Sequence, residues 1–340
     1  MQETFLLGTY TKKSSKGIYT VQLDTETSTL SEVQVMIAES GPTYLAQSLN
    51  GVVYTVSANN GNGGVAAYSP DGSRLNIVAE EGAAPCYVAV DETRQLVYGA
   101  NYHKGEVTVY KIEHDGTLTL ADRIVHEEPL GPHENQNHAH VHYADLTPDY
   151  RLAVCDLGTD SVYTYDVSEQ GTLTLVARYQ AEPGTGPRHL AFHPNGRIAY
   201  LFGELDSTLT TLAYHQETGT FTKQQKISTL PADYQAFNGG AAVRVTKDGQ
   251  FVYASNRGHN SLAVYQIHVD GQLSLVEIVP SNGEIPRDFN FNQSEDFLLC
   301  AHQDSDNLVL FSRDAKSGKL TVVQNDVVAP ECVCVTQKKA

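Results

Sequence analysis

A segment of 44 to 55 residues recurs along the chain, and this repeat is the strongest constraint on its fold. Two clear copies begin at Pro148 and Lys247 and read PDYRLAVCDLGTDSVYTYDVSEQGTLTL and KDGQFVYASNRGHNSLAVYQIHVDGQLSL. One aligned position marks seven copies, at Leu7, Tyr54, Tyr98, Ala153, Tyr200, Tyr253 and Leu299. The spacing of these markers matches the length of one four-stranded blade of a β-propeller.

The apolar pattern within each copy predicts strands rather than helices. Most apolar runs are short, alternating and rich in Val, Tyr, Thr and Leu, and few show the helical period of 3.6 residues. Turn signals such as Asp-Gly and Asn-Gly follow roughly every 8–12 residues. We therefore expect an all-β chain that forms a seven-bladed β-propeller of four-stranded antiparallel blades. The two longest copies contain insertions at 126–137 and 230–239.

The two ends of the chain predict how the ring closes. The N-terminal copy lacks a first strand, because Phe5-Leu6-Leu7 already matches the second strand of the other copies. The run Glu331–Val335 matches a first strand, but no blade follows it. The C-terminal strand should therefore join the N-terminal blade through main-chain hydrogen bonds and leave no open edge. Residues 1–340 would then form a single domain that does not survive being split.

Composition excludes several classes of partner. The net charge of −17 argues against nucleic acid, because phosphate backbones require a basic surface. No apolar run approaches the roughly 20 residues that span a bilayer, so no membrane partner is expected. The start MQETFLLGTY does not resemble a signal peptide, and the five scattered cysteines fit a reduced, cytoplasmic protein. The oligomeric state is left open.

Polar residues at two positions of each copy are predicted to share one rim of the central channel. Within a blade, the first strand begins on the face where the second strand ends. Three arginines fall at these positions, Arg188, Arg257 and Arg287, and the hairpin at 186–206 should bring Arg188 close to Glu204. The other candidates at the rim are His138, His140, Asn256 and His302. A basic opening in an acidic protein suits a small anionic ligand.

Each of these residues also has a purely structural interpretation. The arginines could bond loop carbonyls, and Glu204 could serve only as an ion-pair partner of Arg188. His138, His140 and His142 alternate, so they should point to one face of a strand, where three imidazoles could bind zinc or iron. Hydrogen-bonded channel lining is the commoner role of such histidines, and no matching carboxylate stands close in sequence. We therefore expect no metal.

Several long motifs resemble one known family. The segments HAHVH, GPRHLAFHPNGRIAYLFGELDSTLT, DGQFVYASNRGHNSLAVY and IPRDFNFNQSEDFLLCAHQDSDNLVLF are similar to the lactonase family of seven-bladed propellers. The resemblance extends from Gly8 to the final strand. That family includes bacterial 6-phosphogluconolactonases and fungal carboxy-cis,cis-muconate lactonising enzymes. The resemblance implies that His140, Arg188, Glu204 and Arg257 are the catalytic residues.

The resemblance also implies a reaction, the hydrolysis of 6-phosphogluconolactone to 6-phosphogluconate without metal or organic cofactor. Glu204 or His140 would act as general base toward water, and the other would protonate the ring oxygen. Arg188 or Arg257 would stabilise the oxyanion, and Arg287 would hold the phosphate. Together with Arg287, the substrate-binding residues would be His138, Asn256 and His302.

Two alternatives remain open at this point. One is a muconate cycloisomerase, in which the same acid moves a proton at carbon while the arginines hold carboxylates. The other is a propeller without catalytic activity that binds a protein or a sugar. In either enzymatic case the expected ligand is a small anionic lactone or phosphosugar.

Overall fold

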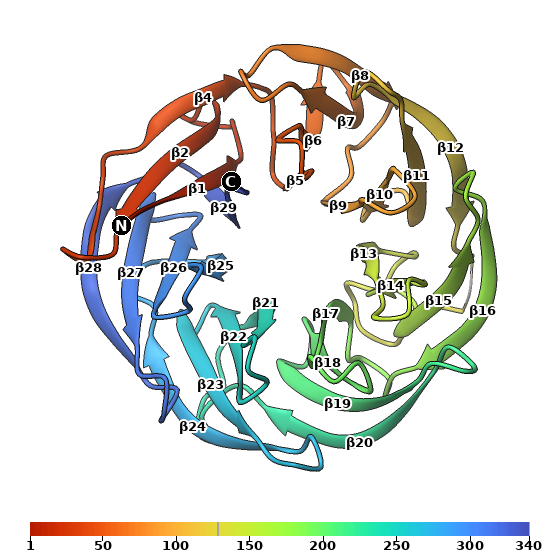
Figure 1. The fold of residues 1–340 in the computed structure, drawn as a ribbon. Coiled ribbons are helices and arrows are strands. Elements are labelled where there is room, and N and C mark those ends of the chain that lie inside the picture. Colours follow the sequence, from red (N-terminus) through yellow and green to blue (C-terminus); the bar gives the residue numbers. More distant parts are fainter. Residues whose placement is uncertain (128, 340) are drawn as a thin grey trace.

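Seven antiparallel sheets stand around a central channel like the blades of a propeller (Figure 1). The computed structural model describes residues 1–127 and 129–339, and these residues contain strands and loops but no helix. The predicted all-β, seven-bladed architecture is confirmed. Within the described residues there is accordingly no helix long and apolar enough to cross a membrane.

Six blades consist of four consecutive strands, each paired with the next in the chain. The first of these blades contains β5 (Leu45–Gln47), β6 (Val53–Asn59), β7 (Asn62–Tyr68) and β8 (Arg74–Glu81). The second contains β9 (Tyr87–Asp91), β10 (Leu96–Asn101), β11 (Glu106–Ile112) and β12 (Leu118–Val125). The third contains β13 (Val141–Leu146), β14 (Leu152–Asp156), β15 (Ser161–Val167) and β16 (Leu173–Gln180). The fourth contains β17 (Pro187–Phe192), β18 (Ile198–Gly203), β19 (Thr208–His215) and β20 (Thr220–Ser228). The fifth contains β21 (Gly239–Val245), β22 (Phe251–Arg257), β23 (Ser261–Ile267) and β24 (Leu273–Pro280). The sixth contains β25 (Pro286–Phe291), β26 (Phe297–His302), β27 (Asn307–Arg313) and β28 (Leu320–Val328). The first strand of each blade lies nearest the channel (Figure 1).

The remaining blade is built from both ends of the chain. The C-terminal strand β29 (Cys332–Gln337) pairs antiparallel with β1 (Gln2–Thr9), so that Leu7 lies opposite Val335. The sheet continues outward through β2 (Gly17–Asp24), which pairs with β3 (Thr29–Leu30) and β4 (Gln34–Ala38). The predicted closure of the ring is therefore confirmed, and it leaves no first or second strand unpaired.

Three of the four tyrosines that mark the repeat connect neighbouring blades through hydrogen bonds. Tyr54, Tyr200 and Tyr253 are at most 1% exposed. Their hydroxyl groups donate to the carbonyl oxygens of Gly116, Gly271 and Gly318, respectively, at 3.3, 3.0 and 2.5 Å. Each acceptor belongs to the Gly-containing turn before the outer strand of the next blade. A buried tyrosine needs such a partner, which explains why this residue recurs at the blade length.

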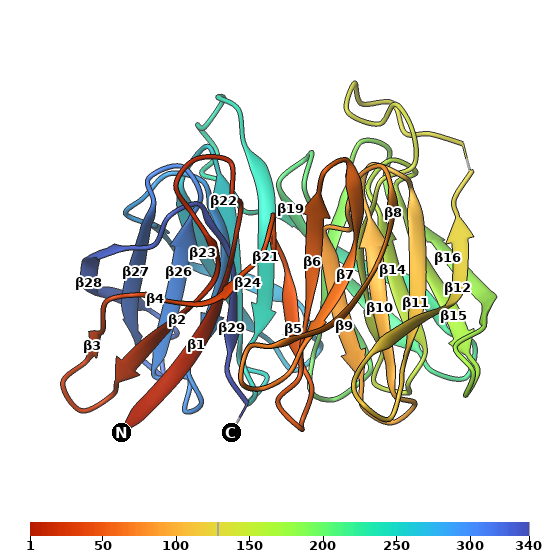
Figure 2. The ribbon, with the colours of Figure 1, turned by 90° about the horizontal axis from the view of Figure 1, so that it is seen from above.

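Both predicted insertions project from the same end of the ring (Figure 2). The first, at 126–137, lies between β12 and β13, and residue 128 within it is outside the described residues. The second, at 230–239, lies between β20 and β21. These loops stand over the end of the channel at which the first strand of each blade begins.

Removing residues 332–340 should destabilise the whole ring. The deletion takes away four buried side chains of β29, Cys332, Val333, Cys334 and Val335, and exposes the main-chain edge of β1. At about 1–2 kcal/mol for each buried side chain, the free energy of unfolding should fall by about 5 kcal/mol. Urea denaturation followed by circular dichroism measures this change. Removing only residues 338–340, which lie beyond the strand, should cost much less; equal losses from the two deletions would contradict the role of the strand pairing.

Candidate functional site

Seven equivalent side chains, one from the start of each innermost strand, surround the channel below the inserted loops. They are Thr43, Cys86, His142, Arg188, Ala241, Arg287 and Val333. At His142, Arg188 and Arg287 the pairing with the second strand shifts register. Such a β-bulge inserts one extra residue and changes the direction of a side chain. All three side chains line cavities of the channel.

Aromatic residues form the layer beneath this ring. They follow the ring residues in sequence, and they include Tyr44, Tyr87, Tyr143 and His189. The ring centroids lie 4.2 Å apart for Tyr44 and Tyr87, 4.9 Å for Tyr87 and Tyr143, and 5.8 Å for Tyr143 and His189. Here the channel narrows to a cavity of about 30 Å³. The aromatic layer therefore acts as the floor of the site.

Glu204 and two arginines form a partly buried charge cluster in the wall of the channel. Glu204 follows β18, Arg188 is the second residue of β17, and Arg257 ends β22. Glu204 Oε2 lies 2.9 Å from both Arg188 Nε and Arg257 Nη2. Arg188 also donates through Nη1 to the carbonyl of Ala241 at 2.6 Å, and Arg257 through Nη2 to that of Gly240 at 2.9 Å. The structure thus brings together three of the four predicted catalytic residues.

The arginines keep Glu204 ionised. Burial alone would raise the pKa of the Glu204 carboxyl, but Arg257, Arg188 and Arg287 together lower it below its usual value. Burial, followed by repulsion from Arg257, lowers the pKa of Arg188 to about 9, so this guanidinium still carries its charge at neutral pH. The group contains three cations and one carboxylate, and its net charge is positive. A basic pocket therefore exists within a strongly acidic protein.

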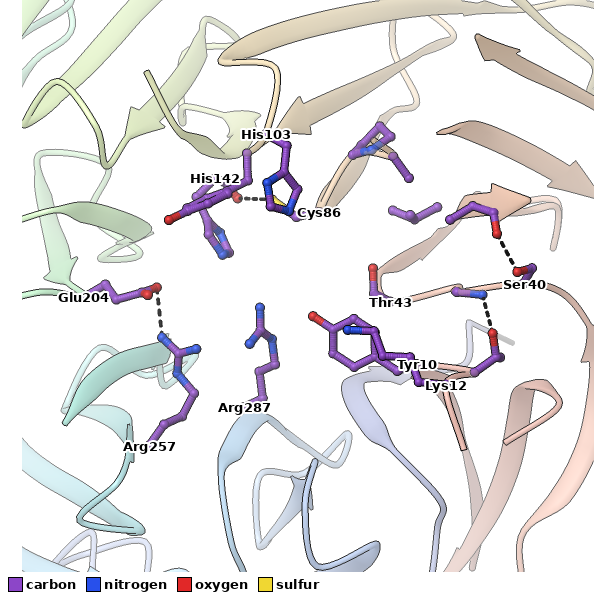
Figure 3. Close-up of a pocket in the computed structure, with 17 residues that line it drawn as sticks. Tyr10, Lys12, Ser40, Thr43, Cys86, His103, His142, Glu204, Arg257 and Arg287 are labelled. Carbon is purple, nitrogen blue, oxygen red and sulfur yellow. Dashed lines mark hydrogen bonds and ion pairs between the residues drawn. The ribbon is translucent and has the colours of Figure 1, made fainter. Parts of the chain in front are cut away.

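A cavity of about 540 Å³ opens beside this cluster (Figure 3). Glu204, Arg257, Arg287 and His142 line one part of it, and Tyr10, Lys12 and Thr43 line another. Ser40, Cys86 and His103 complete the residues labelled in Figure 3, and Tyr102 also lines the cavity. The volume lies in the range of sites for small molecules.

His142 lines the cavity, as does His103. Its side chain is buried, and Nδ1 has no hydrogen-bond partner among the described residues. Burial, together with the charges of Arg188 and the other nearby arginines, lowers the pKa of His142 well below its usual value, so the imidazole is neutral. The sequence analysis considered this residue only as a metal ligand. Its equivalence to Arg188 and Arg287 in the repeat would have identified His142 as a residue that faces the channel.

His140 lies behind the wall of the cavity rather than on it. β13 begins only at Val141, so the expectation that His138, His140 and His142 share one face of a strand is wrong. His140 Nδ1 donates to the carbonyl of Tyr102 at 2.9 Å, and the two rings stack with centroids 4.0 Å apart. His138 contacts the carbonyl of His103 through Nε2 at 3.2 Å. Neither His138 nor His140 is among the described residues that line the cavity.

Asn256 and His302 point into the blades. Each stands one residue before the position that Glu204 and Arg257 occupy in their blades, and side chains alternate along a strand. Asn256 donates to the carbonyl of Thr229 at 2.9 Å, and its Oδ1 accepts from the Thr229 hydroxyl at 2.8 Å. His302 donates to the carbonyl of Asn307 at 3.2 Å, and burial lowers its pKa to about 4. These two residues hold loops, whereas Arg287 lines the cavity as expected.

No three His, Cys, Asp or Glu side chains within residues 1–127 and 129–339 are grouped so that they could hold a metal ion. This includes the three histidines at 138, 140 and 142.

Comparisons with known proteins match nearly the whole chain in each case. The family model described as "Lactonase, 7-bladed beta-propeller" matches residues 4–337. The chain is 41% identical to the 6-phosphogluconolactonase of Bacillus subtilis, over 97% of this chain and 96% of that protein. A crystal structure of a protein from Lactobacillus plantarum superposes with a TM-score of 0.98 at 49% identity, covering 99% of both chains. The periplasmic gluconolactonase of Pseudomonas aeruginosa superposes with a TM-score of 0.93 at 28% identity, also over 99% of both chains.

The Glu204→Gln variant should be less stable than the wild type, in a manner that depends on pH. The substitution leaves Arg188 and Arg257 without their counter-charge, a loss on the order of 3 kcal/mol. Because the pKa of Glu204 is lowered in the folded protein, its contribution is complete above the ordinary value of 4.5 and is lost as the pH falls through the folded value. The difference between the two proteins in free energy of unfolding should therefore be constant from pH 7 to about pH 5 and decrease below that.

Urea denaturation at a series of pH values measures this difference. Glu217→Gln, at an exposed carboxylate, is the matched control and should show no such difference. A Glu204→Gln variant as stable as the wild type at pH 7 would contradict the importance of the ion pairs.

Proposed function

This chain belongs to the lactonase family of seven-bladed β-propellers, and we propose from its site that it hydrolyses 6-phosphogluconolactone to 6-phosphogluconate. The proposal rests on the ionised Glu204, which pairs with two arginines on the wall of the cavity. Arg287 and a neutral His142 line the same cavity. The name of the Bacillus subtilis relative supports the choice of substrate.

The reaction sets three requirements for the site. A water oxygen bonds to the lactone carbonyl carbon and gives a tetrahedral oxyanion. The bond between that carbon and the ring oxygen then breaks, and the ring oxygen takes a proton to become a hydroxyl group. The water has lost its protons overall, one to the ring oxygen and one to solvent, when the carboxylate product forms. The site must therefore accept a proton, stabilise an oxyanion and return a proton.

Arg257 suits the oxyanion. It lines the cavity beside Glu204, and it does not need to reorganise to meet a negative charge there. Arg188 lies in the deeper, narrower part of the channel and is engaged by Glu204 and Ala241. We assign Arg188 as a positioning residue, which fixes the carboxylate rather than contacting the substrate.

Glu204 and His142 have different roles: Glu204 orients the attacking water, and His142 transfers the proton. Both ion pairs of Glu204 use Oε2, so Oε1 is the oxygen that orients the attacking water. His142 is neutral and takes the proton from that water. Because the surrounding arginines disfavour an imidazolium, the protonated His142 readily gives its proton to the departing ring oxygen. His140 contributes indirectly, since its ring supports Tyr102 in the cavity wall.

Direct assay of freshly prepared 6-phosphogluconolactone, corrected for spontaneous hydrolysis, tests the proposed function. The wild type should accelerate hydrolysis, and a chelator should leave the rate unchanged because every proposed group is a side chain of the protein. A rate no higher than the spontaneous one would contradict the proposed activity. Loss of activity in chelator would instead assign the reaction to a metal.

Two histidine variants separate a catalytic role from a supporting one. His142→Ala should lower kcat by about 10²- to 10⁴-fold, the usual contribution of a general acid or base. His140→Phe retains a ring against Tyr102 but cannot transfer a proton, and it should keep kcat within about tenfold of the wild type, a cost of roughly 1.4 kcal/mol. Steady-state kinetics of both folded variants provides the measurement. The reverse ranking would assign proton transfer to His140.

A further inference from the structure

Two cations of the cavity lack the carboxylate partners that the others have. Among the described residues, neither Lys12 nor Arg287 forms an ion pair with a carboxylate, whereas Arg188 and Arg257 both pair with Glu204. Both unpaired cations line the 540 Å³ cavity. Arg287 has one weak contact with an uncharged side chain, at 3.5 Å from Nη1 to Gln303 Oε1. In a chain with a net charge of −17, two uncompensated cations in one cavity indicate an anionic ligand.

These two cations meet at one aromatic ring. Lys12 Nζ lies 4.3 Å from the centroid of the Tyr10 ring, and Arg287 Cζ lies 5.8 Å from it. In Figure 3, Arg287 lies between Glu204 and the part of the wall formed by Tyr10, Lys12 and Thr43. The face of Tyr10 attracts both cations, so that Lys12 lies on the side of the cavity remote from Glu204 and Arg287 lies between the two sides.

The backbone that carries Lys12 is held by a buried carboxylate. Glu331 is 3% exposed, and its two carboxylate oxygens accept hydrogen bonds from the four successive N–H groups of residues 12–15, at 2.9 to 3.1 Å. Its carbonyl oxygen accepts from the N–H of Tyr10 at 3.0 Å. Burial alone would raise the pKa of Glu331, but these backbone N–H groups lower it below its usual value. The Lys12 loop is therefore fixed before a ligand arrives, which reduces the entropic cost of binding.

We propose that Lys12 and Arg287, arranged about Tyr10, form the phosphate subsite of the cavity, with Glu331 as the positioning residue for Lys12. This inference rests on the proposed function, because it places the substrate across the cavity. In the lactone ring, the carbonyl carbon and C5 both flank the ring oxygen, and the phosphate extends from C5 on the C6 arm. With the carbonyl at Arg257 and Glu204, this arm extends toward Arg287 and Lys12. The subsite selects phosphorylated over unphosphorylated sugar lactones.

Lys12→Met should alter specificity rather than catalysis. A charge-assisted hydrogen bond contributes about 1.5–3 kcal/mol, so kcat/KM for 6-phosphogluconolactone should fall by about 10- to 100-fold. For glucono-1,5-lactone, which has no phosphate, kcat/KM should change by less than about twofold. Lys13→Met is the matched control, because Lys13 is the adjacent exposed lysine and is not among the described residues that line the cavity, and it should leave both substrates unaffected. Equal losses on both substrates, or no loss on either, would overturn the proposal.

Glu331→Gln tests the positioning role through the ratio of the two kcat/KM values. The variant should lower the preference for the phosphorylated lactone, and adding Lys12→Met should lower it little further, since both changes act on one contact. An unchanged preference in Glu331→Gln would show that Glu331 acts only on stability, and additive losses would show that it acts independently of Lys12; either result would overturn its assigned role.

A binding measurement keeps the subsite testable if the lactonase activity itself is absent. Wild type that hydrolyses neither lactone would overturn the proposed function alone. Calorimetric titration with 6-phosphogluconate and with gluconate then decides the subsite. The wild type should prefer the phosphorylated acid, and Lys12→Met should lose that preference. An equal preference in both proteins, or none in the wild type, would overturn the subsite.

Discussion

The pairing of β29 with β1 is the interaction on which the rest of the molecule depends. It converts a row of similar blades into a closed ring, and only a closed ring brings the starts of all seven innermost strands around one channel. Residues as distant in sequence as Tyr10 and Arg287 become neighbours by this means. The same junction places Glu331, the residue before β29, beneath the loop that carries Lys12. The same strand pairing therefore both closes the fold and assembles the site.

Because the blade repeats, the site can be described as a set of equivalent positions, one in each blade. The repeat holds the backbone constant, so the side chain at each position is free to differ from blade to blade. At the channel-facing position the chain places hydroxyl, thiol, imidazole and guanidinium groups in different blades. The register shift occurs at this position in five blades, those of His142, Arg188, Ala241, Arg287 and Val333, so the bulge belongs to the common scaffold and the side chain distinguishes the blades. The scaffold is symmetric, and the chemistry arises from its departures from symmetry.

Charge balance then gives the cavity two different sides. Near Glu204, a carboxylate compensates the buried Arg188 and the partly exposed Arg257 and fixes their positions. Near Tyr10, Lys12 and Arg287 have no such compensation among the described residues. A paired cluster is rigid and suited to the reacting centre, whereas unpaired cations are available to a ligand. This difference gives a substrate with one anionic end a definite direction in the cavity.

The sequence by itself determined the strands, the seven blades and the closure of the ring, because turn residues and alternating apolar residues act locally and their spacing repeats. It also determined that Arg188, Glu204 and Arg257 meet, because each stands at a fixed place in its blade. Only the tertiary structure decided that His142 rather than His140 faces the cavity, and that Asn256 and His302 turn away from it. A shift of one residue reverses the direction of a side chain on a strand, and bulges and strand starts are set by packing between blades rather than by local sequence. For the same reason Lys12 gained a role only when contacts more than 300 residues away in sequence fixed its loop.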